Sequence, residues 1–361
     1  MADIISIATA VPDHCHKQSD ILHFMQDIYE LDDTDKRKLK FLYEHSGINT
    51  RFSVIEDYGV EPAYRSFIPE EKGAAFPLLE QRMEIFDRES VLLSVKAIDN
   101  CLQDIITPSQ ITHLITVSCT GMSAPGLDLM IMEEMQLAPD IFRTSVNFMG
   151  CYAAIHGLKL AKMICDSTLD ANVMVVCTEL CTLHFQKEFT EDNAASSLLF
   201  AEGCAAVLVS NNVQHANAIS LRGFYSYVAQ KGNAAMAWQL SSKGFLMTLS
   251  GYVPQLIEED INTLVEAALQ HNHISLEDIT HWCIHPGGKR ILDLIQKKLH
   301  LAEDALTHSR AVLAKYGNMS SPTVLFVLKE MMDKKINTNN TILGMAFGPG
   351  LTMETFIAAG K

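Results

Sequence analysis

The stretch MGCYAAIHGLKLAKMI, residues 149–164, has a counterpart in YGNMSSPTVLFVLKEMM, residues 316–332, in the second half of the chain. A second pair, ITHLITVSCTG (111–121) and ITHWCIHPGG (279–288), precedes the first pair in the same order. In each half a β-branched, strand-like run ends in glycine and is followed by helix-period sequence. Two similar stretches in the same order indicate an internal repeat.

The spacing of glycines within the two halves supports this repeat. When Gly150 is aligned with Gly317, the glycines that end the two preceding strand-like runs lie at equal distances upstream. The same alignment sets Cys151 opposite Asn318. We therefore interpret the chain as a duplicated α/β unit, in which Cys151 and Asn318 occupy equivalent positions at the starts of equivalent helices.

Hydrophobic periodicity along the whole chain alternates between the helical and the strand pattern. The pattern predicts strands over 111–121, 173–180, 204–211, 279–288 and 341–347, and helices over 89–105, 126–137, 258–272, 289–300, 310–332 and from near Cys151. This alternation is typical of a mixed or parallel sheet covered by helices. The pattern breaks near 211–219, which divides the chain into an N-terminal half, 1–213, and a C-terminal half, 214–361.

Composition excludes several classes of partner. The 361 residues carry a formal net charge of −15, which argues against binding to nucleic acid or to an anionic membrane. None of the 9 cysteines forms a CxxC pair, so a zinc ribbon is not expected and reduced thiols are. No apolar run approaches the roughly 20 residues that span a bilayer, and the first residues lack a signal-peptide pattern. We expect a cytoplasmic protein.

Three polar residues at strand-to-helix junctions form a candidate catalytic set. Cys151 and Asn318 precede equivalent helices, and His285 ends a strand before Pro-Gly-Gly. Open α/β sheets bind ligands at such strand ends. A thiol at a helix N-terminus beside an imidazolium is expected to be a thiolate at neutral pH. His285 and the Asn318 amide could then donate hydrogen bonds to an oxyanion. Each residue alone is more often structural: a core cysteine, a core histidine and a helix cap.

Four motifs, VNFMGCYAAIHGLKLA, CIHPGGKRILD, KYGNMSSPTVLFVL and MAFGPGLTMET, closely resemble those of type III polyketide synthases, the chalcone-synthase-like enzymes. The similarity covers most of the chain. It implies the thiolase fold, a duplicated five-layered αβαβα architecture, and a homodimer. It also implies acyl-CoA and malonyl-CoA substrates without a cofactor or a metal. Cys151 would be loaded with a starter acyl group, and His285 and Asn318 would hold the enolate that decarboxylation of malonyl-CoA produces.

The resemblance assigns further roles residue by residue. Phe200 matches a gatekeeper phenylalanine, Ser320 a cavity serine, and Gly348 the loop that shapes the cavity wall. Lys38, in the basic run at 36–40, and Gly287 match positions that contact CoA. Departures from the plant enzymes bear on specificity, and they are Met247 at the second gatekeeper, Cys119, Cys181 and His184 at threonine positions, Ala124 at a methionine position, and Ala201 and Glu202 in FAEG. Exchange of bulky side chains for small or flexible ones is expected to open the cavity.

These departures resemble the bacterial branch of the family. They favour a medium- or long-chain fatty acyl starter and an alkylpyrone or alkylresorcinol product. A malonyl-primed, tetrahydroxynaphthalene-type synthase stays open, since Cys119 also fits such enzymes. The alternatives outside this branch are a ketoacyl synthase III using malonyl carrier protein, a hydroxymethylglutaryl-CoA synthase with Glu179 as base, and an inactive scaffold.

Overall fold

The computed structural model describes residues 2–69, 74–229, 232 and 235–361. Within this part of the chain, nine strands form one mixed sheet in the order β11–β12–β13–β8–β1–β7–β6–β4–β5. These strands are β1 (Asp3–Ala10), β4 (His113–Ser118), β5 (Phe142–Asn147), β6 (Asn172–Leu180), β7 (Glu202–Ser210), β8 (Ile219–Val228), β11 (His281–Ile284), β12 (Thr341–Gly348) and β13 (Thr352–Gly360).

Eight of the nine strands form two equivalent halves of the sheet, and β5 extends the N-terminal half at its edge. In the N-terminal half the order is β1–β7–β6–β4, and in the C-terminal half it is β8–β13–β12–β11. The pairing directions also agree, because β4–β6 and β11–β12 are parallel whereas the other neighbours within each set are antiparallel. Only the short pairing of Asp3 with Ser220 and Ile4 with Ile219 joins β1 to β8. The duplication predicted from the sequence is confirmed.

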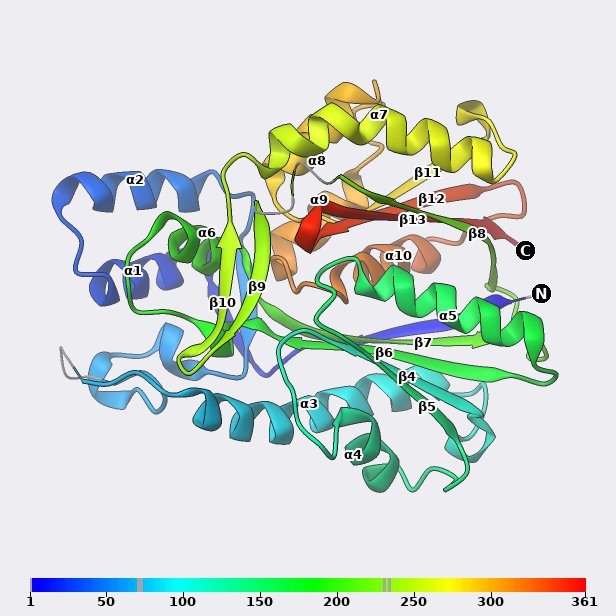
Figure 1. Ribbon diagram of the computed structural model, residues 1–361, viewed down its shortest axis with the longest axis horizontal. Coiled ribbons are helices and arrows are strands. Elements are labelled where there is room, and N and C mark those ends of the chain that lie inside the picture. Colours follow the sequence, from blue (N-terminus) through cyan, green and yellow to red (C-terminus); the bar gives the residue numbers. More distant parts are fainter. Residues whose placement is uncertain (1, 70–73, 230–231, 233–234) are drawn as a thin grey trace.

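Helices cover and separate these two halves of the sheet (Figure 1). Helices α5 (Ala153–Ser167) and α10 (Thr323–Asp333) lie between them, and each contacts strands of both halves. The outer layers are α3 (Leu79–Leu102) with α4 (Leu127–Glu134), and α7 (Val253–His271) with α8 (Lys289–Lys298). The result is the expected αβαβα layering of the thiolase fold.

Central position explains the composition of the inner helices. The first six residues of α10, TVLFVL, are all buried, and α5 begins with the small apolar run AAI, because both helices have a sheet on either side. The outer helix α7 instead buries Val253, Ile257, Ile261 and Leu264, which form one stripe at helical spacing. The central strands β6 and β7 are buried along their whole length, as expected where both faces of the sheet are covered.

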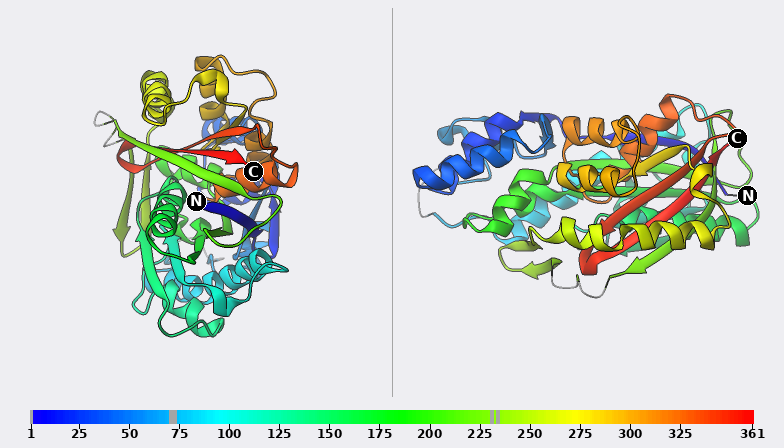
Figure 2. Two further views of the ribbon diagram at one scale, coloured as in Figure 1. Left: turned by 90° about the vertical axis from the view of Figure 1, so that its right-hand side faces the viewer. Right: turned by 90° about the horizontal axis from the view of Figure 1, so that it is seen from above.

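The remaining elements gather mainly at one end of the molecule, opposite the chain termini (Figures 1 and 2). They are β2 (His14–Lys17) paired with β3 (Thr50–Ser53), α1 (Gln18–Ile28), α2 (Asp33–Glu44), α6 (Glu191–Leu199), the hairpin β9 (Met236–Ser241)–β10 (Gly244–Leu249), and α9 (Thr307–Tyr316). Short 3₁₀ turns are η1 (Glu56–Gly59), η2 (Pro62–Tyr64), η3 (Pro108–Gln110), η4 (Cys181–His184), η6 (Leu276–Asp278) and η7 (Pro349–Leu351).

Several element boundaries differ from the sequence expectation; the strand expected over 279–288, for example, is the shorter β11. Helix α3 begins at Leu79, ten residues before the predicted 89–105, and the segment 310–332 forms two helices, α9 and α10, separated by the turn that contains Asn318. Helix α5 begins at Ala153 rather than at Cys151. None of the described helices has the length and apolarity needed to cross a membrane.

Candidate active site

Cys151, His285 and Asn318 line one cavity of about 340 Å³ between the two halves. Cys151 precedes α5, His285 follows β11, and Asn318 lies between α9 and α10. Their exposed fractions are only 7%, 1% and 3%, respectively. The three side chains predicted to act together are therefore brought together, and both halves contribute to the site.

The equivalent glycines turn the chain in the same way in the two halves. Gly150 has a φ of 84° and Gly317 a φ of 71°, both in the left-handed region that favours glycine. At Gly150 a Cβ atom would also lie 2.2 Å from Pro349 Cδ, so a side chain is excluded there by contact as well as by conformation. These turns direct Cys151 and Asn318 from the layer of α5 and α10 into the cavity.

The backbone at Cys151 is held from two sides. The Gly150 amide donates to Cys119 Sγ at 2.9 Å. On the other side Gly348 packs so closely that a Cβ atom there would lie 3.3 Å from the Cys151 nitrogen and 2.6 Å from Tyr152 Cδ1. Gly348 therefore borders the nucleophile's backbone, although it does not line the cavity itself.

Burial dominates the electrostatics of the cysteine and the histidine. It raises the pKa of the Cys151 thiol to about 12; hydrogen bonds with Ser320 and Asn318 act against this, and the nearby Glu179 carboxylate adds to it. Burial also lowers the pKa of His285 to about 3. Neither nitrogen of His285 has a hydrogen-bond partner among the described residues. Burial of both side chains therefore opposes the resting thiolate and imidazolium that the sequence predicts.

Asn318 is fixed through both its side chain and its backbone. Its Nδ2 donates to Gly287 O at 3.3 Å, and its Oδ1 accepts from the Ser320 amide at 2.9 Å. Its own amide donates to Leu199 O at 2.9 Å, and its carbonyl accepts from the Ala201 amide at 2.8 Å. This bridge ties Asn318 to the segment that carries Phe200.

Glu179 connects the two halves beside the nucleophile. The fully buried carboxylate accepts hydrogen bonds from the Cys119 amide at 2.9 Å, Thr120 Oγ1 at 2.8 Å and Ser321 Oγ at 2.7 Å. Burial raises its pKa, and these hydrogen bonds act in the opposite direction. All its partners are donors, and it joins the end of β4 to the turn that holds Asn318. This arrangement gives Glu179 a structural role that the sequence reasoning missed; a carboxylate ending the buried run VMVVCTEL was the available signal.

The other predicted cavity residues divide into those that line the cavity and those that do not. The lining residues are Phe200, Met247, Cys119, Cys181, Ser320 and Gly287. Ala124 lies exposed in the loop before α4, outside the lining that this chain provides, and its assignment to the cavity wall stays a prediction. Lys38 is exposed on α2, bonded to Asp35 at 2.9 Å, one turn before the cavity-lining Leu42.

His184 is also absent from the main cavity. Its Nε2 faces Thr120 O at 2.8 Å, and its Nδ1 accepts from the Phe245 amide at 3.1 Å, so the ring links the loop after β4 to the hairpin β9–β10. Burial lowers its pKa to about 3. On the same hairpin, Trp238 Nε1 donates to Cys119 O at 2.6 Å. The expectation that His184 forms the wall of the catalytic cavity is therefore wrong.

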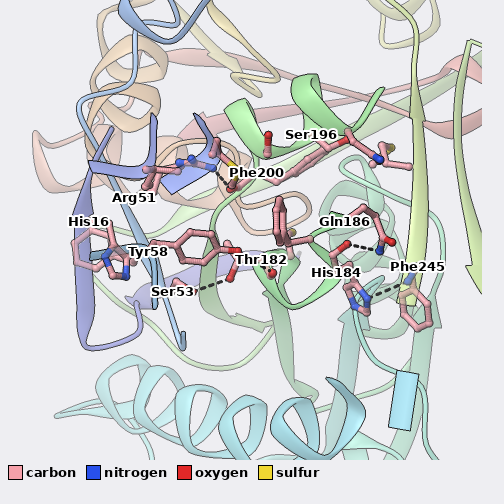
Figure 3. Close-up of a pocket in the computed structure, with 18 of the residues that line it drawn as sticks. His16, Arg51, Ser53, Tyr58, Thr182, His184, Gln186, Ser196, Phe200 and Phe245 are labelled. Carbon is pink, nitrogen blue, oxygen red and sulfur yellow. Dashed lines mark hydrogen bonds between the residues drawn. The ribbon is translucent and has the colours of Figure 1, made fainter. Parts of the chain in front are cut away.

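A second, smaller pocket of about 50 Å³ lies behind the wall formed by Cys181, Phe200, Trp238 and Met247 (Figure 3). His184 and Arg51 line this pocket. The cavity residues that sequence reasoning missed include the basic Lys289 and Arg290 at the start of α8 and His45 next to the end of α2. Among the described residues, no group of histidine, cysteine and carboxylate side chains is arranged to hold a metal.

Comparison with known proteins identifies the family. The model of the N-terminal domain of chalcone and stilbene synthases matches residues 1–213, and the model of their C-terminal domain matches residues 225–360. A Bacillus subtilis (strain 168) protein named "Putative chalcone synthase" is 28% identical over 374 residues, which cover 99% of this chain and 98% of that protein.

Two solved structures share the fold over nearly their full length. PKS-I from the brown alga Ectocarpus siliculosus has a TM-score of 0.90 at 24% identity and covers 100% of this chain and 98% of its own. The C-terminal type III polyketide synthase domain of Steely1, a type I/III hybrid from Dictyostelium, has a TM-score of 0.89 at 25% identity, with 99% of each chain covered. The chain thus belongs to the chalcone and stilbene synthase family and is a CoA-dependent type III polyketide synthase.

Proposed function

We propose that this enzyme extends a Cys151-bound acyl starter with two-carbon units from malonyl-CoA and then cyclises the product. The observation that carries the proposal is the convergence of the buried Cys151, His285 and Asn318 side chains in one cavity. A nucleophile beside a proton-accepting imidazole is what acyl loading needs, and two neutral hydrogen-bond donors are what the enolate of the extension step needs.

In the loading step, Cys151 Sγ attacks the carbonyl carbon of the starter acyl-CoA. The thiol proton moves to His285, whose two nitrogens have no partner in the described structure. Burial opposes an isolated thiolate and an isolated imidazolium, but a thiolate next to an imidazolium is neutral overall. The C–S bond to CoA then breaks, CoA leaves as its thiol with that proton, and the acyl group stays on Cys151.

In the extension step, malonyl-CoA loses CO₂ and leaves an enolate of acetyl-CoA. Neutral His285 and Asn318 Nδ2 donate to its oxygen, and the low pKa of His285 keeps the imidazole neutral for this role. The enolate carbon attacks the acyl thioester, a C–C bond forms, and the acyl C–S bond to Cys151 breaks. The released cysteine can then take up the β-ketoacyl product for another round.

The cavity mouth supports binding of the CoA moiety. Lys289 and Arg290 at the first turn of α8 line the cavity, so basic side chains and helix N–H groups face the same opening. Lys38 lies on the α2 face that also carries Leu42, four residues on. We propose that these three side chains contact CoA phosphates and that the pantetheine arm passes Gly287.

The walls of the cavity support a fatty acyl starter. Apolar side chains dominate the lining, among them Leu198, Leu199, Met236 and Phe347 together with the flexible Met247. An alkylpyrone or alkylresorcinol is the product that such a starter gives. Cys119 also lines the cavity, which keeps a malonyl-primed synthase as the second candidate.

A homodimer through the edge strand β5 is also part of the proposal. Strand β5 ends the sheet, so one side of its backbone is unpaired, and Phe142 at its start is 71% exposed. Met122 (53% exposed) and Leu129 (39% exposed), in and after the loop before α4, add apolar surface in the same region of the fold. Light scattering should give twice the chain mass, and Phe142→Lys should lower it; a monomeric wild type would contradict the assembly.

Mass spectrometry of the products tests the function. The enzyme is incubated with malonyl-CoA alone and with starters from acetyl-CoA to stearoyl-CoA, with Cys151→Ala as the inactive control. Multi-ketide pyrones or resorcinols that need a fatty starter support the proposal. A naphthalene product from malonyl-CoA alone would overturn the starter, and a single condensation that requires malonyl carrier protein would overturn iteration.

A further inference from the structure

Arg51 is a buried cation without a carboxylate partner in the described structure. It lies on β3, is 3% exposed, and forms no ion pair with any described residue. Its Nε donates to Gln18 Oε1 at 2.9 Å, and its Nη1 donates to the carbonyl oxygen of Phe200 at 2.6 Å. Figure 3 shows the guanidinium extending to Phe200. A buried, unpaired charge is costly, so its surroundings must compensate it.

The compensation comes from the C-terminus of α6, where the helix ends next to Phe200. The last carbonyls of a helix have no partner within the helix and together carry a partial negative charge. Here each has a donor from elsewhere: Tyr43 Oη donates to Ser197 O at 3.2 Å and Gln18 Nε2 to Leu198 O at 3.0 Å. Leu199 O, the last carbonyl of the helix, accepts from the Asn318 amide, and Arg51 binds the carbonyl of the C-cap residue Phe200 directly after the helix.

The same arginine also packs against the turn of the C-terminal half. A Cβ atom at Gly317 would lie 2.9 Å from Arg51 Cγ and 3.0 Å from its Cδ, so the aliphatic part of Arg51 lies directly against the glycine that precedes Asn318. Phe200 and Asn318 are bridged backbone to backbone. Arg51 therefore contacts Phe200 at one end of this bridge and Gly317, the residue before Asn318, at the other, from a strand that contributes nothing to the catalytic cavity itself.

We propose that Arg51 is a positioning residue for the extension step, holding Phe200 and Asn318 in place by capping the end of α6. The proposal rests on the proposed function, in which Asn318 donates to the enolate oxygen and Phe200 forms the cavity wall. Loading of Cys151 requires neither the α6 cap nor the Asn318 amide to be held within tenths of an ångström. Enolate formation does, because a preorganised donor loses most of its effect when it is displaced.

Arg51→Met keeps the aliphatic packing and removes the donors. We expect the kcat of malonyl-CoA decarboxylation, measured as CO₂ release, to fall at least about tenfold, while KM changes much less. Acylation of Cys151 by the starter, measured as intact protein mass over time, should stay within about twofold of wild type. Arg51→Lys, which keeps the charge and can still reach one carbonyl, should recover part of the decarboxylation rate.

Arg82→Met is the matched control. Arg82 is equally buried and also binds backbone carbonyls, those of Pro77 and Phe185 among them, but it does not touch Phe200 or Asn318. The Arg82→Met variant should have a lower melting temperature, but its rate of decarboxylation should not fall more than its rate of loading. Equal losses in loading, decarboxylation and melting temperature in both arginine variants would overturn the positioning role, as would an unchanged kcat in Arg51→Met. A wild type that neither loads starter nor releases CO₂ would instead refute the proposed function.

Discussion

Replacing Gly348 with alanine should disturb the nucleophile without introducing any polar change. Its φ is −169°, an extended conformation that alanine adopts freely, so the effect is purely one of contact. The added Cβ would lie 2.6 Å from Tyr152 Cδ1 and 3.3 Å from the Cys151 nitrogen, whereas carbon atoms normally pack at about 3.5–4.0 Å. Tyr152 must therefore move by about 1 Å, and it is bonded directly to Cys151.

The magnitude follows from two general scales. Overpacking of this kind costs roughly 1–3 kcal/mol, which corresponds to a fall in melting temperature of roughly 1–4 °C for a chain of this length. A displacement of about 1 Å at a reacting atom costs up to about 100-fold in rate. We therefore expect the rate of Cys151 acylation to fall at least about tenfold, a larger effect than the modest loss of stability would suggest.

The assay is intact-mass measurement of acyl transfer to Cys151, with thermal unfolding measured on the same samples. Gly251→Ala is the control, because a Cβ atom at Gly251 meets nothing within 4 Å. It should match wild type in both measurements. If Gly348→Ala loads as fast as wild type and melts at the same temperature, Tyr152 yields at no cost and the reasoning is refuted.

Three further predictions follow from burial and from the shape of the cavity. Because burial raises the pKa of Cys151 to about 12, its alkylation by iodoacetamide should accelerate from pH 6 to pH 9; a plateau below pH 7 would reveal a resting thiolate–imidazolium pair instead. Burial raises the pKa of Glu202 to about 8 from 4.5, so the folded protein retains a proton that the unfolded chain has lost, and stability falls as pH rises through that window. The melting temperature of wild type should therefore fall relative to that of Glu202→Gln from pH 5 to pH 8.5. A difference that stays constant over this range would contradict the raised pKa of Glu202. Met247→Phe places a stiff ring in the wall shared by the two pockets, and product analysis with the starter ladder should show a preference for shorter chains; an unchanged preference would exclude Met247 from starter selection.

The repeat could be predicted because duplication leaves similar short sequences at equivalent positions in the two halves. Gly150 and Gly317 are needed where the chain turns with positive φ, and each stands at the same place in a strand–turn–helix unit. Cys151 and Asn318 follow directly, so the alignment alone placed them at equivalent points. Even the face of α2 that carries Lys38 and Leu42 follows from helical spacing.

Contacts between segments that are distant in the sequence could not be predicted in this way. Gln18 reaches Leu198, which is 180 residues away, and Arg51 reaches Phe200, which is 149 residues away. No periodic pattern marks a pair of this kind. The degree of burial at Cys151 is likewise a property of packing from several elements. The sequence pattern therefore predicts the helix start beside this residue but not the desolvation that raises its pKa.

The contacts that join the two halves beside the cavity are also the contacts that hold the catalytic side chains in place. Neither half contains a complete site, because Cys151 comes from one half and His285 and Asn318 from the other. The hydrogen bonds that cross the boundary beside them, from Ser321 to Glu179 and between Asn318 and the segment around Phe200, involve the neighbours of the reacting groups and not a distant surface. A change that loosens these contacts therefore misplaces the donors, and activity should fall even where other contacts between the halves, such as the β1–β8 pairing, preserve the fold.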